Sequence, residues 1–147
     1  MTEDIRDSAG RRVRLDKNDS VVSAAPTLVK NGKVAIDADA EGIVDAEYPH
    51  FGYAWANVRQ PRTMAGIDRR GRLILATVDG RLKGGSEGFT IHEAAAFMKS
   101  LGAVQAINLD GGGSTAMAVE GTLINQPSDA AGERSVGDTI QVLPADH

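Results

Sequence analysis

The sequence predicts an α+β fold in which one main helix, over about residues 91–101, packs on a mixed, mainly antiparallel sheet. Short apolar runs alternate with two-residue turn signals, which is typical of antiparallel hairpins. One stretch combines a helix-capping pair with apolar residues at helical spacing. The 17 glycines and few aromatic residues indicate many turns in a strand-rich chain.

The composition narrows the class of protein. A chain of 147 residues is long enough for one domain with a buried core. The net charge of -4 gives no reason to expect a nucleic-acid partner. The absence of cysteine excludes disulfides, thiolate metal ligands and a cysteine nucleophile. No stretch is long and apolar enough for a membrane segment or a signal-peptide core.

The first third of the chain predicts an arm, a hairpin and loops. Residues 1–20 are highly charged, with a short alternating piece, and indicate an edge strand or a loosely held arm. Thr27–Val34 contains Asn31-Gly32 between apolar residues, which is the strongest short hairpin signal. Asp37–Asp45 is acidic and indicates a loop. Tyr48–Trp55 holds four aromatic residues without a clear period, so a loop is expected there as well.

A second hairpin and a glycine-rich loop precede the helix. Strands are expected over residues 63–67 and 73–78, joined by a turn at 68–71, and residues 79–89 form the loop. Thr90 and Glu93 form a capping box that starts the helix, and Gly102 stops it. The apolar stripe of this helix consists of Ile91, Ala94, Ala95, Met98 and Leu101.

The last part of the chain predicts strands around a second glycine cluster. Val104–Leu109 indicates a short buried strand, and residues 116–124 indicate a third hairpin that turns at Glu120-Gly121. A polar loop is expected over residues 125–138, followed by a closing strand from Thr139 to Leu143.

The stretch Asp110–Thr115, Asp-Gly-Gly-Gly-Ser-Thr, is the strongest candidate for a functional site. Three consecutive glycines are unfavourable for local stability, so they indicate close approach of another group or a turn that side chains would block. Their unshielded amides can converge on an anion. Asp110 is a candidate catalytic carboxylate or metal ligand, and Ser114 adds a hydroxyl donor. The spacing fits neither a Walker loop nor a dinucleotide fingerprint, and the alternative is an Asp-capped turn between strands.

Other polar groups recur where strands begin or end. Arg62 and Thr63 open one strand, Asp79 follows another, and Glu133 and Arg134 come shortly before the last. Each alone is compatible with a turn or a surface ion pair. Together they combine arginine forks, which match phosphate oxygens, with carboxylates, which serve glycoside chemistry. The combination indicates a substrate that contains both a phosphate and a sugar.

Several segments carry a family resemblance. Asn108–Thr115 resembles the signature of the phosphodiester glycosidase family. Further segments resemble motifs of that family in the same order: Ala25–Gly32, Pro61–Gly66, Val78–Arg81, Ser86–Glu93, Asn125–Asp129 and Gly132–Asp138. The resemblance covers residues 21–143.

The resemblance implies hydrolysis of a sugar-1-phosphodiester or a polysaccharide that contains one, with release of a sugar such as N-acetylglucosamine. Asp110 and Asp79, with Glu133 as third candidate, are then expected to activate water or stabilise the sugar cation. The expected substrate- and phosphate-binding residues are Arg62, Thr63, Gly111, Gly112, Gly113, Ser114 and Arg134. The spacing specifies no cofactor, and a divalent cation held by Asp110 with a neighbouring carboxylate stays open.

Two other functions stay open. A non-catalytic module could bind a sugar phosphate, with Tyr53 and Trp55 stacking on the sugar. A metal-dependent phosphodiesterase would instead cleave at phosphorus.

Domains of this family usually begin with a further segment that carries an Asn-Gly-Gly-Phe-Phe-like strand, and the sequence has none. We therefore expect residues 1–20 to form the arm or edge strand and residues 21–147 to form the family domain without that segment. An open sheet edge would favour a homo-oligomer. The resemblance implies an extracellular or cell-envelope location.

Overall fold

The computed structural model describes residues 5–7, 9–17, 19–44 and 47–144. The main sheet consists of β1 (Thr27–Lys30), β2 (Lys33–Val34), β3 (Arg62–Asp68), β4 (Leu73–Val78) and β5 (Ala103–Asn108). The helices are α1 (Pro49–Asn57), α2 (Ile91–Ser100) and the short 3-10 helix η1 (Gly112–Ser114), and β6 (Ala118–Val119) pairs with β7 (Thr122–Leu123) in a separate hairpin.

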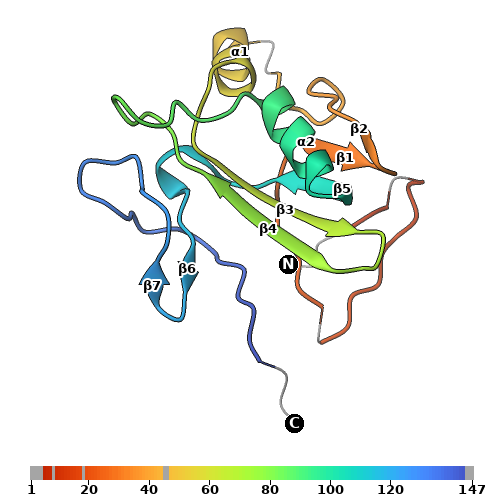
Figure 1. The fold of residues 1–147 in the computed structure, drawn as a ribbon. Coiled ribbons are helices and arrows are strands. Elements are labelled where there is room, and N and C mark those ends of the chain that lie inside the picture. The colour runs from red at the N-terminus through yellow and green to blue at the C-terminus, as the bar shows by residue number, and fades with distance from the viewer. Residues whose placement is uncertain (1–4, 8, 18, 45–46, 145–147) are drawn as a thin grey trace.

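The main sheet has the order β2-β1-β5-β3-β4, and each neighbouring pair of strands is antiparallel. Helix α2 packs against β1, β5 and β3 on one face of the sheet, with α1 beside it (Figure 1). The predicted α+β fold is therefore confirmed.

The predicted hairpin turns have the expected backbone geometry. Asn31 and Gly32 have φ angles of 53° and 73°, and Glu120 and Gly121 have φ angles of 51° and 75°. Two successive positive φ angles are the requirement of a type I′ turn, whose twist matches that of the flanking strands.

Helix α2 begins at the predicted residue and ends one residue before the predicted end, at Ser100. The Thr90 hydroxyl accepts the amide of Glu93 at 3.2 Å, and the Glu93 carboxylate accepts the amide of Thr90 at 2.9 Å. Gly102 follows the helix with a φ of 91°. The buried core consists of Leu28, Val29, Met64, Ala76, Ile91, Ala94, Ala95, Met98, Ala103 and Ala106. Leu101, predicted as part of the apolar stripe, is 46% exposed instead, because the helix ends at Ser100.

Two predictions about secondary structure are wrong, and of the two alternatives for residues 1–20 the edge strand is not found. Residues 49–57 form helix α1 rather than a loop, with Pro49 in the first turn, where its missing N–H is harmless. Thr139–Leu143 forms no strand, and Val142 and Leu143 are 70% and 75% exposed. The described residues between 5 and 20 contain only an isolated bridge between Arg6 and Arg12, so the edge strand is absent from them, while residues 1–4, 8 and 18 lie outside the described part.

No helix within the described ranges is long and apolar enough to cross a membrane.

Candidate active site

The antiparallel pairing brings the predicted site residues to one end of the sheet. Arg62, at the start of β3, pairs with Val78, at the end of β4, and Met64 pairs with Asn108, at the end of β5. The segments that leave β4 and β5 therefore meet where β3 begins (Figure 1). These segments carry Asp79 and Asp110, so motifs far apart in the sequence share one location.

The Gln60–Pro61 backbone forms the centre of this location, and three glycines from two loops pack against it. A Cβ atom on Gly80 would lie 2.6 Å from the nitrogen of Pro61, and one on Gly111 would lie 2.8 Å from its carbonyl oxygen. A Cβ atom on Gly88 would overlap the carbonyl of Gln60. Only glycine permits this approach, which explains why glycine occurs at these three positions.

Charged side chains pack on Gly112 and Gly113, the two glycines that follow Gly111. The guanidinium of Arg81 lies over Gly112, where a Cβ atom would be 3.2 Å from Nη2. The ion pair between Arg134 and Asp129 packs on Gly113 in the same way. The expectation that the glycines permit close approach is therefore confirmed, and the groups that approach include two arginines.

The amides of the glycine loop are largely used within the protein. The amide of Gly111 donates to Asp110 Oδ1 at 2.8 Å, that of Gly112 donates to the Pro61 carbonyl at 2.9 Å, and that of Ser114 donates to the Gly111 carbonyl at 3.1 Å. Among the described residues, no acceptor is bonded to the amide of Gly113. Of the predicted amide cradle, this conformation leaves Gly113 as the donor without a protein partner.

Arg62 is a buried cation, only 1% exposed, and backbone carbonyls surround it. Its Nε donates to Phe89 O at 2.8 Å, and its Nη2 donates to Trp55 O at 2.6 Å and to Val58 O at 3.2 Å. The guanidinium also lies 5.0 Å from the ring centre of Trp55. Burial, and secondarily the charge of Arg81, lower the pKa of Arg62 to about 10. This geometry commits Arg62 to the protein, and its contact with phosphate stays a prediction.

Arg81 is the candidate site residue that the sequence analysis did not single out. Its Nε donates to Gln60 Oε1 at 2.6 Å, and its terminal nitrogens lie beside Gly112. No carboxylate of the described residues forms an ion pair with it. Its backbone has a φ of 58°, a left-handed conformation that is unfavourable for a non-glycine residue. The sequence signal for Arg81 was its place at the end of the Val78–Arg81 segment, two residues after Asp79.

The three candidate carboxylates differ in their surroundings. Asp79 is half-buried and accepts the side-chain amide of Asn125 at 3.0 Å and the backbone amide of Gln126 at 3.0 Å, so it fixes the start of the polar loop. Asp110 is exposed on the glycine loop, and its second carboxylate oxygen has no protein donor among the described residues. Glu133 is exposed, and no described residue bonds to its side chain.

The remaining predicted residues lie around the same loop. The hydroxyls of Thr63 and Thr115 are 3.4 Å apart, which is a long hydrogen bond between β3 and the residue that follows η1. Ser114 is half-buried in η1. Arg134 donates from Nε to Asp129 Oδ2 at 2.7 Å, so its fork is engaged by a carboxylate rather than open.

The structure provides no metal-binding cluster to accompany Asp110. Within the described ranges, no group of three or more His, Cys, Asp and Glu side chains could hold a metal ion. The described residues therefore do not fit the divalent cation that the sequence left open as a possibility at Asp110.

The fold and the site together define an α+β domain with a glycine loop, flanked by arginines and carboxylates, at one end of its sheet. The chain belongs to the phosphodiester glycosidase family, whose family model matches residues 3–143. Membership of this family supports a phosphodiester glycosidase function at the level of the family.

The similarity of this chain to individual relatives agrees with its assignment to this family. Mouse N-acetylglucosamine-1-phosphodiester alpha-N-acetylglucosaminidase is 37% identical over 111 residues, which is 74% of this chain and 21% of the mouse protein. The structure of an exported protein from Burkholderia pseudomallei is 44% identical, with a TM-score of 0.63 over 74% of this chain and 20% of that one. The zebrafish catalytic domain of the same glucosaminidase, described as auto-inhibited by its pro-peptide, is 29% identical, with a TM-score of 0.62 over 84% of this chain and 38% of that one. This chain thus spans about a fifth of the length of the mouse relative.

Proposed function

We propose that this chain hydrolyses a sugar-1-phosphodiester by cleaving the bond between the anomeric carbon of the sugar and the phosphodiester oxygen. One observation supports this above the others. The Arg81 fork lies open beside the glycine loop, has no carboxylate partner among the described residues, and lies close enough to buried Arg62 to lower its pKa. Such an excess of positive charge at a loop with a free amide favours an anionic ligand.

Glycosidic cleavage of such a substrate requires mainly electrostatic stabilisation of the departing phosphate. As the C–O bond breaks, its electron pair stays on the phosphate oxygen, and the leaving group departs as a phosphate monoester. Water supplies a hydroxyl to the anomeric carbon and gives its proton to a base. Phosphate is a weak base, so donors aimed at its oxygens help more than a general acid does. Arg81 is the exposed donor that this site offers, and the amide of the buried Gly113 has no acceptor among the described residues.

The carboxylates take different parts in this proposal. Asp110 is exposed on the loop that lies under Arg81 and has a free oxygen, so we assign it to the activation of water. Asp79 is bonded to Asn125 and Gln126, so its contribution would be its negative charge, which stabilises an oxocarbenium-like sugar. Glu133 is the third candidate. Arg134 would join the phosphate by exchanging Asp129 for a phosphate oxygen.

The proposal is tested by replacing Asp110 with Asn and measuring sugar release from N-acetylglucosamine-1-phosphoglycerol. We expect the rate to fall by about 100-fold or more, because general-base catalysis is typically worth 10²–10⁴ in rate. Asp39→Asn, an exposed acid in the loop after β2, is the matched control and should retain the wild-type rate. Both variants should unfold at the same urea concentration as the wild type. Turnover by Asp110→Asn that equals that of the control would contradict the assignment.

A further inference from the structure

A groove of about 590 Å³ lies beside the candidate active site. Its lining consists of Arg59, Arg81, Leu82, Lys83, Gly84, Gly85 and Glu87. This lining contains three cationic side chains and one carboxylate, although the whole chain has a net charge of -4. The lining of the groove therefore carries a local excess of positive charge on an acidic protein.

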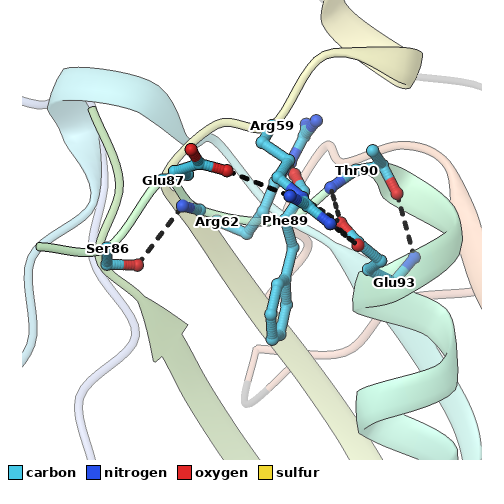
Figure 2. A network of polar contacts seen from close by, with 8 residues as sticks. Arg59, Arg62, Ser86, Glu87, Phe89, Thr90 and Glu93 are labelled. Carbon is cyan, nitrogen blue, oxygen red and sulfur yellow. Dashed lines mark hydrogen bonds and ion pairs between the residues drawn. The ribbon is translucent and has the colours of Figure 1, made fainter. Parts of the chain in front are cut away.

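Two of the three cations in the groove are not neutralised. Arg59 donates from Nη1 to Glu87 at 3.0 Å and from Nη2 to Glu93 at 2.6 Å, and these two carboxylates raise its pKa (Figure 2). The charges of Arg59 and Glu87 are thus already balanced. Arg81 and Lys83 form no ion pair with any carboxylate in the part of the chain that the structure describes. They are the groups available to an anion.

The loop that carries Arg81 and Lys83 is held by its own hydrogen bonds. The amide of Leu82 donates to Ser86 O at 3.0 Å, and that of Gly85 donates to Leu82 O at 2.9 Å. Ser86 accepts the amide of Gly88 and so connects this loop to the start of α2 (Figure 2). Arg81 and Lys83 are two residues apart, so their Cα atoms lie within about 7 Å of each other. The two cations can therefore contact neighbouring groups of one ligand.

The groove shares Arg81 with the candidate active site. Arg81 both lies over Gly112 and lines the groove, whereas no residue of Asp110–Ser114 lines it. A phosphodiester bound at Arg81, with its sugar toward Asp110, would direct its other substituent into the groove. That substituent departs with the phosphate as part of the leaving group.

We propose that this groove binds a second phosphate on the leaving-group side of the substrate. The inference rests on the proposed function, because that function defines which side is the leaving group. It makes the substrate an oligomer or polymer in which phosphodiesters repeat, rather than a single phosphodiester with a neutral substituent. Lys83 is the specificity-determining residue, since Arg81 also serves the first phosphate.

Binding of sugar-free probes tests this inference independently of catalysis. Calorimetry compares glycerol 1-phosphate with glycerol 1,3-bisphosphate for the wild type, Lys83→Met and Lys99→Met. Lys99 is exposed in the last turn of α2, so its variant has the same net charge as Lys83→Met but an intact groove. We expect the wild type and Lys99→Met to prefer the bisphosphate by about tenfold, and the preference to fall to about twofold in Lys83→Met, because one charge-assisted contact is lost.

Three results would overturn the inference: a wild-type preference of twofold or less, the same preference in both variants, or no measurable binding of the bisphosphate. The proposed function is tested separately with N-acetylglucosamine-1-phosphoglycerol, with and without a terminal phosphate. If neither compound is hydrolysed, the proposed function is rejected. The binding preference measured by calorimetry would still decide whether the groove binds a second phosphate.

Discussion

Replacing Arg62 with Met separates a structural role from a role in phosphate binding. Methionine fills most of the buried volume but removes the positive charge and its donors. Three carbonyls, of Trp55, Val58 and Phe89, then lose their partner. Hydrogen bonds to a charged group contribute about 2 kcal/mol each, so their loss costs about 6 kcal/mol.

Part of this loss is recovered, because the buried charge is itself unfavourable. The pKa of Arg62 falls from 12.5 to about 10, which means that folding disfavours its charged form. That pKa difference corresponds to a cost of about 3 kcal/mol for burying the charged guanidinium, and Arg62→Met removes this cost. The net expectation is a decrease of about 3 kcal/mol in the free energy of unfolding, a large fraction of the stability of a typical domain.

Urea unfolding followed by circular dichroism measures this decrease. With an m value of about 2 kcal/mol/M, the midpoint should fall by about 1.5 M. Arg81→Met is the matched control: Arg81 is exposed and makes one bond to a neutral amide, so its midpoint should shift by less than about 0.5 M. A midpoint for Arg62→Met that equals or exceeds the wild-type value would refute the structural role of Arg62.

Two further predictions concern the glycine contacts and the helix cap. Gly88→Ala should unfold at a much lower urea concentration than Gly84→Ala. Both glycines have a positive φ, but only a Cβ atom on Gly88 would meet the Gln60 backbone. Equal urea midpoints would show that the contact is relieved at little cost. Glu93→Gln should remove part of the acid sensitivity of stability. Arg59, and then the amide of Thr90, lower the pKa of Glu93 from 4.5 to about 2, so its contribution is complete above pH 4.5 and is lost as pH falls toward 2. The difference in unfolding free energy between wild type and variant should therefore be larger at pH 7 than at pH 3, and an equal difference would contradict the ion pair.

The elements that the sequence predicts well are those with local chemical signals. The Asn31-Gly32 and Glu120-Gly121 turns need positive φ angles at adjacent positions, and the capping box around Thr90 requires particular side chains three residues apart. Such requirements are visible in a few neighbouring residues. The glycine loop is similar, because three consecutive glycines after a buried strand indicate either close approach of another group or a turn that side chains would block.

Features that depend on distant partners could not be predicted. Helix α1 buries only Gly52, so it has no apolar stripe to reveal its period. The alternating residues near Ile140 have the pattern of a strand, but pairing needs a sheet edge that the pattern cannot specify.

The contacts of the two arginines at the site also depend on distant residues and could not be predicted. Arg62 and Arg81 both follow recognisable motifs, and nothing local indicates which one is buried among carbonyls and which one faces the glycine loop. That difference arises from the packing of two glycine-rich loops around Gln60 and Pro61. The predicted location of the site therefore agrees better with the structure than the predicted contacts of individual side chains.

Hydrolysis of N-acetylglucosamine-1-phosphoglycerol in ¹⁸O-labelled water tests the central claim most directly. Mass spectrometry of the products locates the bond that breaks. Glycosidic cleavage predicts one labelled oxygen on the anomeric carbon of the released sugar and none on the glycerol phosphate. Label on the phosphate would contradict glycosidic cleavage and identify attack at phosphorus, and the absence of any product would contradict hydrolysis by this chain.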